Sequence, residues 1–264
     1  MKIAVMSDLH FINIFVSPEE ADNFWQRVAE SSVDAAIICG DIAESALTLR
    51  VLNSAAKILK KPVLFVLGNH DFYKSSFFFS RQIKESIEER EDLIYLHYST
   101  GFAINDSTYI VGVDGWGDAG YTNISVNEFL PLNDFNQISD LANSSSRLRA
   151  MKNYAEWSAV YLENQLEQAL KTNAKKIIIV THVPPFSEIC FYKGLPMEQK
   201  SLAVFSCKKT GDVIRSYAEQ YPEIQFQVYC GHTHSAASLQ ISSNLHATVL
   251  GAEYGKPKFA IVEL

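Results

Sequence analysis

The stretch Leu67-Gly68-Asn69-His70-Asp71 decides how this chain is organised. It ends an apolar run, residues 62–67, that is short, rich in β-forming side chains and followed by glycine, which is typical of a buried parallel strand. Asn69 and His70 are therefore expected on the loop at the carboxyl end of that strand. In open α/β sheets, ligands bind at this edge. Polar residues that follow other strands would meet there, however far apart they lie in the sequence.

Four other apolar runs end in the same manner, with a carboxylate or an imidazole close behind the strand. Asp8 and His10 are two residues apart, so an extended chain turns both to one side. Convergence of such side chains at one edge of a sheet predicts a metal site. The candidate ligands that follow the five predicted strands are Asp8, His10, Asp41, Asn69, His182, His232 and His234.

The number and type of these donors indicate how many ions the site takes. One ion needs about four to six ligands including water, whereas seven protein ligands suit two ions that share a bridging carboxylate. Mixed nitrogen and oxygen donors without thiolate favour manganese, iron or zinc over calcium or a structural cysteine-bound zinc. The choice among these three metals stays open.

Helical segments alternate with these strands. Ser17-Pro18-Glu19-Glu20 combines a serine cap, a proline in the first turn and a glutamate three residues after the cap, which predicts a helix over residues 17–31. The alternation predicts βαβ units and a mainly parallel sheet, and a hairpin of residues 102–104 and 109–113 adds antiparallel pairing. Further helices are predicted over residues 45–60, 80–90, 147–171 and 211–220, and further strands over 93–98, 238–241, 246–250 and 258–262.

Length and composition indicate an ordinary globular protein. With 264 residues, 47% of them hydrophobic, the chain can bury a large core, and we expect one domain over residues 1–264. The regular pattern breaks at residues 114–121, and residues 122–146 are polar with two patches rich in Asn and Ser. This predicts a cap or insertion around residues 114–150.

Net charge and targeting signals limit the binding partners and the location that we expect for this protein. A formal net charge of −7 disfavours binding to nucleic acid or to an anionic membrane, but leaves room for a small phosphorylated substrate because bound cations could supply positive charge. The N-terminal apolar run is too short for a signal peptide, and no run reaches membrane-spanning length. The four cysteines show no Cys-x-x-Cys pair, which indicates reduced thiols in a cytoplasmic protein. The oligomeric state stays open.

Five short blocks resemble the signature blocks of the calcineurin-like metallophosphoesterase superfamily, in the family's order and across nearly the whole chain. They are Asp8-x-His10, Gly40-Asp41, Gly68-Asn69-His70-Asp71, His182 and Gly231-His232-x-His234. The resemblance implies an α/β fold, a four-layer αββα sandwich of two mixed β-sheets flanked by helices. It also implies that Asp41 bridges two ions, of which one is bound by Asp8, His10 and His234 and the other by Asn69, His182 and His232.

A site of this kind implies a phosphoesterase mechanism. Two cations close together lower the pKa of a shared water, so that a bridging hydroxide attacks a small phosphodiester or phosphomonoester. His70 adjoins the ligand set without belonging to it. The resemblance suggests that His70 protonates the departing alkoxide and that Asp71 orients its ring. A purely hydrogen-bonding role for His70, without proton transfer, is the alternative.

Departures from the family pattern separate this chain from the Ser/Thr protein phosphatases. Their second block continues with Asp-Arg-Gly and their third ends in Glu, whereas here Ile42-Ala43-Glu44 follows Asp41 and the third block ends in Asp71. These two blocks are closer to those of the stand-alone bacterial phosphoesterases. A metal-dependent nuclease of the same superfamily is the alternative function, disfavoured by net charge. A non-catalytic scaffold on this fold is a third hypothesis, and such a protein would be expected to lose ligands or His70.

Two loops are expected to meet the substrate. Residues 114–121 are rich in glycine and aromatic side chains, and residues 183–197 contain prolines and aromatics. For each of the residues in these loops, packing in the core is the alternative to substrate contact. His97 and His246 lie away from the blocks and are interpreted as structural. The candidate substrate-binding residues are Trp116, Asp118, Tyr121 and Phe186.

Overall fold

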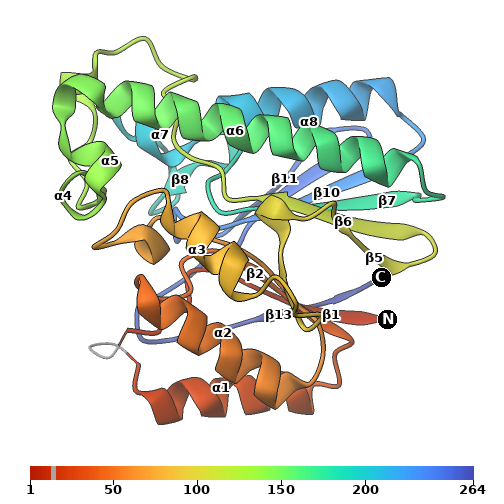
Figure 1. Cartoon of the computed structure of the whole chain (residues 1–264). Coiled ribbons are helices and arrows are strands. Elements are labelled where there is room, and N and C mark those ends of the chain that lie inside the picture. Colours follow the sequence, from red (N-terminus) through yellow and green to blue (C-terminus); the bar gives the residue numbers. More distant parts are fainter. Residues whose placement is uncertain (13–15) are drawn as a thin grey trace.

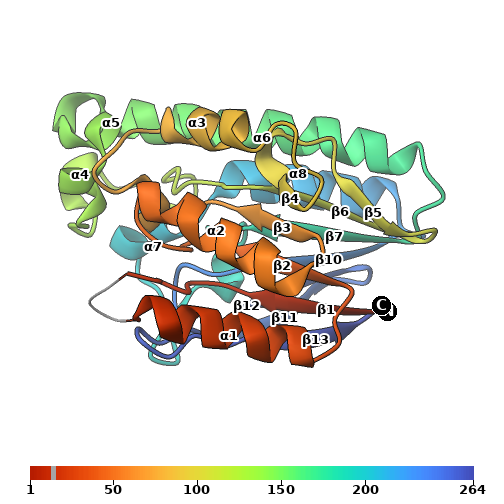
Figure 2. The ribbon, with the colours of Figure 1, turned by 60° about the horizontal axis from the view of Figure 1, so that its bottom comes forward.

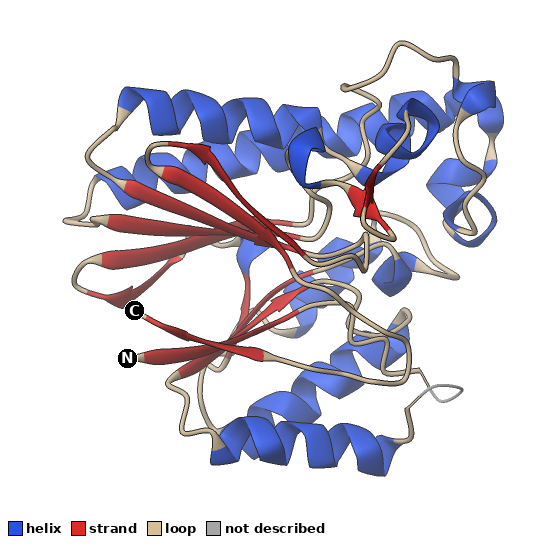
Figure 3. Cartoon of the chain, turned by 180° about the vertical axis from the view of Figure 1, so that it is seen from behind, coloured by secondary structure: helices blue, strands red, loops and turns tan. Residues whose placement is uncertain are grey.

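Two stacked mixed sheets form the centre of the molecule. The computed structural model describes residues 1–12 and 16–264. Helices cover the outer face of each sheet, with α1 and α2 on one side and α6 and α8 on the other (Figure 1). Figure 3 shows the same four layers from behind. The predicted αββα sandwich is therefore confirmed.

The N-terminal sheet has the strand order β13-β1-β2-β3-β4. Its four N-terminal strands run parallel, and β13 pairs antiparallel with β1 at the edge. Figure 2 shows α1 and α2 lying side by side over this sheet. The elements are β1 (Lys2–Met6), α1 (Pro18–Glu30), β2 (Ala35–Cys39), α2 (Ala46–Leu59), β3 (Val63–Val66), α3 (Phe79–Ser86), β4 (Leu93–Tyr95) and β13 (Ala260–Glu263).

The second sheet has the order β11-β12-β10-β7-β6-β5. Its four central strands run parallel, and the edge strands β5 and β11 pair antiparallel with their neighbours. The elements are β5 (Phe102–Asn105), β6 (Thr108–Val113), α6 (Ser144–Leu170), β7 (Lys176–Thr181), α7 (Gln199–Phe205), α8 (Lys208–Gln220), β10 (Gln225–Cys230), β11 (Ala237–Ser242) and β12 (Leu245–Val249).

Alternation along each strand divides the core into layers. In β1, Ile3 and Val5 belong to the apolar cluster that also holds Ile178 and Val180 of the second sheet, so they face between the sheets. Ala4 lies in the cluster that contains the helix side chains of the N-terminal half. Because successive side chains point to opposite faces, a strand buried on both sides must be apolar at every position. This is why these strands lack the polar alternation of a surface sheet.

The expected cap packs directly on the sandwich. Residues 114–150 contain a 3₁₀ turn (Val126–Glu128), α4 (Asp134–Gln137), α5 (Ser139–Ala142) and the first turns of α6. Phe135, Ile138 and Leu141 are buried in the same apolar cluster as the outer face of the N-terminal sheet. The Asp140 carboxylate also accepts a hydrogen bond from the Phe77 amide at 2.8 Å.

Several predicted boundaries differ from the structure. The strand expected over 93–98 ends at Tyr95 and continues as a 3₁₀ turn, and α3 ends at Ser86. α8 begins three residues before the predicted start, and α7 was not predicted. The expected loop 183–197 contains a two-stranded hairpin, β8 (Phe191–Tyr192) with β9 (Leu195–Pro196). Short elements carry too few periodic positions to be detected from pattern. None of the helices in the described part of the chain is long and apolar enough to cross a membrane.

Candidate metal centre

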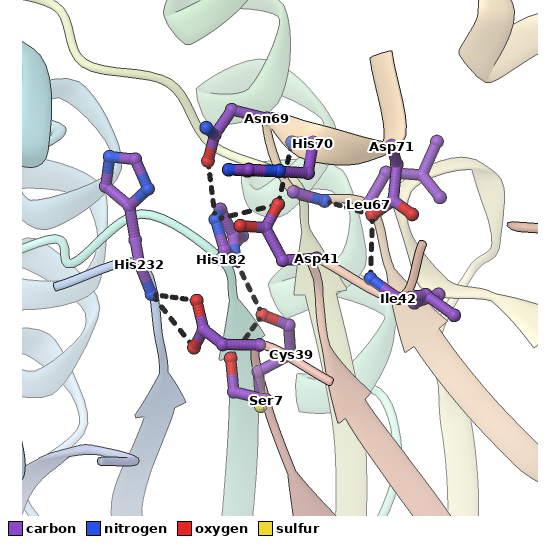
Figure 4. Close-up of polar contacts among 12 residues, drawn as sticks. Ser7, Cys39, Asp41, Ile42, Leu67, Asn69, His70, Asp71, His182 and His232 are labelled. Carbon is purple, nitrogen blue, oxygen red and sulfur yellow. Dashed lines mark hydrogen bonds and ion pairs between the residues drawn. The ribbon is translucent and has the colours of Figure 1, made fainter. Parts of the chain in front are cut away.

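The predicted ligands meet at the carboxyl ends of five strands. β1, β2 and β3 of the N-terminal sheet lead to Asp8 and His10, to Asp41 and to Asn69, and β7 and β10 of the second sheet lead to the three remaining histidines. Figure 4 shows Asn69 and Asp41 directed toward His182, with His232 on the neighbouring strand end.

One group of donors is formed by Asp8, His10, Asp41 and His234, which offer ligand atoms that all lie within 4.8 Å of one another. His10 Nε2 lies 3.1 Å from His234 Nε2 and 3.7 Å from Asp41 Oδ2. His234 Nε2 lies 3.3 Å from Asp8 Oδ1.

A second group lies on the other side of Asp41. His182 Nε2 is 3.0 Å from Asn69 Oδ1 and 3.4 Å from Asp41 Oδ1, and the His232 ring centroid is 4.9 Å from that of His182. The two oxygens of the Asp41 carboxylate therefore face different groups, Oδ2 toward His10 and Oδ1 toward His182.

Backbone carbonyls orient two of the imidazoles. The Cys39 carbonyl accepts a hydrogen bond from His182 Nδ1 at 2.9 Å, and the Val204 carbonyl accepts one from His232 Nε2 at 3.4 Å. Because a carbonyl can only accept, each bonded ring nitrogen carries the proton and the other nitrogen keeps its lone pair. Orientation of a ligating histidine through its second nitrogen is usual at metal sites.

The ligand loops have an uncommon backbone conformation. Asp8, His10, Asp41, His232 and His234 all have positive φ, between 45° and 70°. Non-glycine residues in the left-handed region cost of order 1–3 kcal/mol each, and such residues cluster at functional sites. Four of these five residues, Asp8, His10, Asp41 and His234, offer ligand atoms to the first group.

Two glycines leave the space that the ligands occupy. A Cβ on Gly68 would lie 2.2 Å from Asp41 Oδ1, and a Cβ on Gly231 would lie 2.2 Å from Asp8 Oδ2 and 1.8 Å from Ser7 Oγ. Any side chain at either position would displace a ligand. Only glycine therefore fits at these two positions without displacing a neighbouring side chain.

Burial dominates the electrostatics of the site. Burial and the negative charge of Asp8 raise the pKa of Asp41 well above its usual range. Burial also acts on Asp8, but a hydrogen bond to His234 and the charges of His182, His234 and His10 outweigh it and lower the Asp8 pKa. Burial lowers the pKa of His10 to about 2 and that of His232 well below its usual value, so both rings are neutral at pH 7.

These residues fit metal ions. Asp8 and Asp41 are only 2% exposed each, and no lysine or arginine among residues 1–12 and 16–264 forms an ion pair with either. Buried carboxylates without cationic partners are costly, and neutral imidazoles with free lone pairs are metal ligands. Cations held between the two carboxylates would remove this cost, and the donor set of oxygen and imidazole nitrogen suits them.

Comparison with known families identifies the chain. The sequence profile of the calcineurin-like phosphoesterase family matches residues 1–236. The chain belongs to this family. It is therefore a metal-dependent phosphoric ester hydrolase, and all five sequence blocks lie within the matched residues.

Solved structures share the fold of this phosphoesterase at low sequence identity. The phosphopantetheinyl hydrolase of Mycobacterium tuberculosis is 15% identical with a TM-score of 0.67, covering 96% of this chain and 90% of its own. A dimetal phosphatase from Danio rerio is 13% identical with a TM-score of 0.60, covering 99% of this chain and 91% of its own. None of the curated proteins compared with the sequence matches it.

His70 lies against the ligands of the phosphoesterase, at the edge of the first group. Its ring is 4.5 Å from that of His10 and stacks on Tyr73 at 4.3 Å, and its amide donates to Asp41 Oδ1 at 2.8 Å. Burial and the charge of His182 lower the pKa of His70 to about 4. The ring is therefore neutral at pH 7.

Asp71 supports the loops of the phosphoesterase and does not contact the His70 ring. Its buried carboxylate accepts hydrogen bonds from the amides of Ile42, Ala43 and Gly68 and from the Thr48 hydroxyl, while His70 Nδ1 has no partner among the described residues. The expectation that Asp71 orients His70 is corrected accordingly. Asp71 instead joins the loop after β3 to the loop after β2.

Two residues that the sequence did not single out position Asn69. The buried Asp134 carboxylate accepts a hydrogen bond from Asn69 Nδ2 at 3.0 Å and another from the Tyr73 hydroxyl at 2.7 Å. The first bond fixes the amide so that Oδ1 faces His182. Asp134 belongs to the polar segment 122–146, where a lone acid carries no signal in the sequence.

The aromatic candidates for substrate contact are held by packing in this structure. Trp116 is 5% exposed and packs edge-on against Phe72 and Phe77, and Phe186 is fully buried beneath Arg215. Both rings therefore contribute mainly to the packing of the core.

The polar candidates of the same loops have structural partners as well. Asp118 accepts hydrogen bonds from the amides of Lys208 and Lys209 at the start of α8, which corrects the prediction that it binds substrate. The Tyr121 hydroxyl donates to the Pro185 carbonyl at 2.9 Å, away from the residues that line the cavity at the metal centre. His97 is buried, and its Nδ1 accepts from the Asp114 amide at 3.2 Å.

Proposed function

We propose that this phosphoesterase hydrolyses a small phosphodiester or phosphomonoester, with two ions of manganese, iron or zinc as cofactors. The observation that carries the proposal is the convergence of seven donors around Asp41. Asp8, His10 and His234 would hold one ion, Asn69, His182 and His232 the other, and Asp41 would bridge them. The two named structures, a phosphopantetheinyl hydrolase and a dimetal phosphatase, support this reading.

The chemistry divides between the cofactor and the chain. Two cations, when bound, supply an activated water as nucleophile and neutralise charge on the phosphoryl oxygens. Asp41, His182 and His10 are held before any ion arrives, by the left-handed turns and by the carbonyl bond to His182. Preorganised groups cost little reorganisation during the reaction.

His70 would act on the leaving group. Its neutral ring lies beside the ligands, lines the same cavity and is held by stacking on Tyr73. A neutral imidazole can donate its N–H to an oxygen on which negative charge develops. This hydrogen bond would stabilise the departing alkoxide, and transfer of a proton to the alkoxide would require His70 to carry a second proton.

The alternatives find less support. A nuclease needs a basic surface, whereas the chain has a net charge of −7. A scaffold without activity has no use for a complete ligand set, and the presence of all seven candidate ligands and of His70 in the sequence favours an enzyme. The four cysteines are buried and unpaired, which supports the reducing cytoplasm as the location.

Hydrolysis of model esters tests the proposal. Manganese-loaded protein is expected to hydrolyse bis-p-nitrophenyl phosphate or p-nitrophenyl phosphate, and chelation is expected to abolish the activity. Iron- and zinc-loaded protein, cyclic nucleotides and single-stranded DNA complete the panel. The proposal fails if none of the metal-loaded preparations hydrolyses a small ester, and cleavage of DNA alone would favour the nuclease.

A further inference from the structure

A cavity of about 670 Å³ opens from the metal centre. Metal ligands and His70 line its inner end. Leu130 and Leu132 of the segment before α4 form one part of its wall, and Tyr192, Leu195 and Met197 of the β8–β9 hairpin and the residue after it form another. The Leu130 amide donates to the Lys200 carbonyl at 3.0 Å, which joins the first part of the wall to α7.

Aromatic rings connect the inner end of the cavity to these walls. The Phe205 ring lies 4.5 Å from that of His232, and the Tyr254 ring lies 4.4 Å from that of His10 and 5.0 Å from that of His234. Both aromatic residues line the cavity. Aromatic surface therefore lies directly beside the candidate metal ligands.

The charged side chains of the cavity beyond the metal centre are already engaged. Asp134 accepts from Asn69 and Tyr73, and Lys200 pairs with Glu198 at 3.0 Å. Among the described lining residues, no other lysine and no arginine is available for a second phosphate group. The volume lies within the range typical of small-molecule sites, roughly 300–1,000 Å³.

The hairpin presents apolar side chains to solvent. Leu195 is 70% exposed and Tyr192 is 59% exposed, and both line the cavity. The hairpin is held at its base, where the Met197 amide donates to the Cys190 carbonyl at 3.0 Å. A bound apolar group would cover these exposed side chains and gain hydrophobic free energy.

We propose that this cavity binds the ester group of the substrate and selects an uncharged aliphatic or aromatic group over a polyphosphate or an oligonucleotide. The inference rests on the proposed function, because it places the phosphoryl group at the metal centre. Leu195 and Tyr192 are then specificity-determining residues that contact the part of the substrate that does not react.

Matched esters and a matched variant test the inference. Octyl and methyl esters of p-nitrophenyl phosphate, and octyl and methyl phosphate, differ only in the apolar chain. For manganese-loaded wild-type protein, kcat/KM is expected to be about tenfold or more higher for the octyl member of the pair that is hydrolysed, mainly through a lower KM. In the variant Tyr192→Ser/Leu195→Ser this preference is expected to fall to about threefold or less, because the apolar side chains that the octyl chain would cover are gone. Leu239→Ser, which alters an exposed leucine on β11 outside the cavity, should keep the full preference.

Binding without turnover separates this inference from the proposed function. Octylphosphonate is expected to bind the manganese-loaded protein about tenfold or more tightly than methylphosphonate in calorimetry, and to lose this advantage in Tyr192→Ser/Leu195→Ser. If that result occurs and no ester is hydrolysed, the cavity stands and the proposed function falls. Equal affinities for the two phosphonates, or a preference that survives in the double variant, would overturn the inference while leaving hydrolysis intact.

Discussion

At the scale of single residues, Asp41 lies between the two groups of candidate ligands. Its two carboxylate oxygens face His10 and His182 at 3.7 and 3.4 Å, and it is 2% exposed. We expect Asp41→Asn to lower metal content and hydrolytic activity together, with metal affinity reduced by more than the roughly 10–100-fold seen when an outer partner of a ligand is lost. Metal analysis and kcat on the same preparation check this. The exposed Asp106→Asn is the control, and full occupancy with normal turnover in Asp41→Asn would refute a bridging role.

His70 is expected to affect the leaving group more than metal binding. Its ring contacts His10 and Tyr73 but is not part of the ligand set. General acid catalysis contributes typically 10²–10⁴-fold, and it matters most when the leaving group is a poor one. His70→Ala should therefore slow hydrolysis of an alkyl phosphate far more than that of a p-nitrophenyl ester, with metal content unchanged. Equal losses on both substrates would argue against proton donation.

Asp134 is expected to control the second ion through Asn69. Asp134→Ala removes the acceptor for Asn69 Nδ2 and for the Tyr73 hydroxyl, so the Asn69 amide loses its fixed orientation. We expect about a 10–100-fold loss of affinity for one of two ions, measured as a change from two binding steps to one strong and one weak. Asp134→Asn retains an acceptor oxygen and should recover most of the affinity. Unchanged binding in both variants would limit Asp134 to a packing role.

At the scale of elements, we expect the loop after β6 to support the core. Trp116 packs against Phe72, Phe77 and Tyr154 in the cluster outside the N-terminal sheet. Truncation of a buried tryptophan costs about 3–5 kcal/mol. Trp116→Ala should lower the free energy of unfolding by this amount in urea titrations, while KM for a small ester stays the same in the folded protein. A raised KM with unchanged stability would restore the substrate-contact hypothesis.

The β8–β9 hairpin and α7 are the elements that we expect to select the substrate. They form one wall of the cavity and carry Tyr192, Leu195 and Phe205, whereas the strand ends carry only the reacting groups. Loops and short elements on a rigid scaffold can change without altering the metal ligands. Substrate choice and chemistry therefore lie on separate parts of the fold.

At the scale of the whole molecule, the metal centre joins the two sheets. Asp8, His10, Asp41 and Asn69 follow strands of the N-terminal sheet, and the other three ligands follow strands of the second. A ligand that binds only the folded state stabilises it, by about 2.7 kcal/mol at a concentration 100 times its Kd. Chelation should therefore lower Tm, and return of manganese should restore it. In Asp41→Asn, chelation should change Tm much less, and equal shifts in both proteins would place the effect outside this site.

We infer that residues 1–264 fold as one domain, since the apolar side chains of the segment 114–150 lie in the cluster of the N-terminal sheet. That segment supplies Asp134 to the metal centre and Leu130 and Leu132 to the cavity. The expected cap is thus part of the wall of the site.

The sequence by itself indicated the α/β class, the main strands along the chain and the candidate ligands, and its resemblance to a known family implied the layers. Apolar runs that end in glycine and a carboxylate or imidazole encode both a buried strand and its polar end, and parallel strands bring those ends to one edge. These signals are local, so they can be read without knowing which elements touch.

Only the tertiary structure decided the roles of Trp116, Asp118, Phe186 and Asp71, and only it revealed Asp134, Tyr73 and the cavity. Whether an aromatic ring is buried or open depends on which elements pack against it, and an isolated acid gains a role only from a partner 65 residues away, as Asp134 does from Asn69. Such contacts are set by the packing of distant segments, which leaves no periodic pattern in the chain.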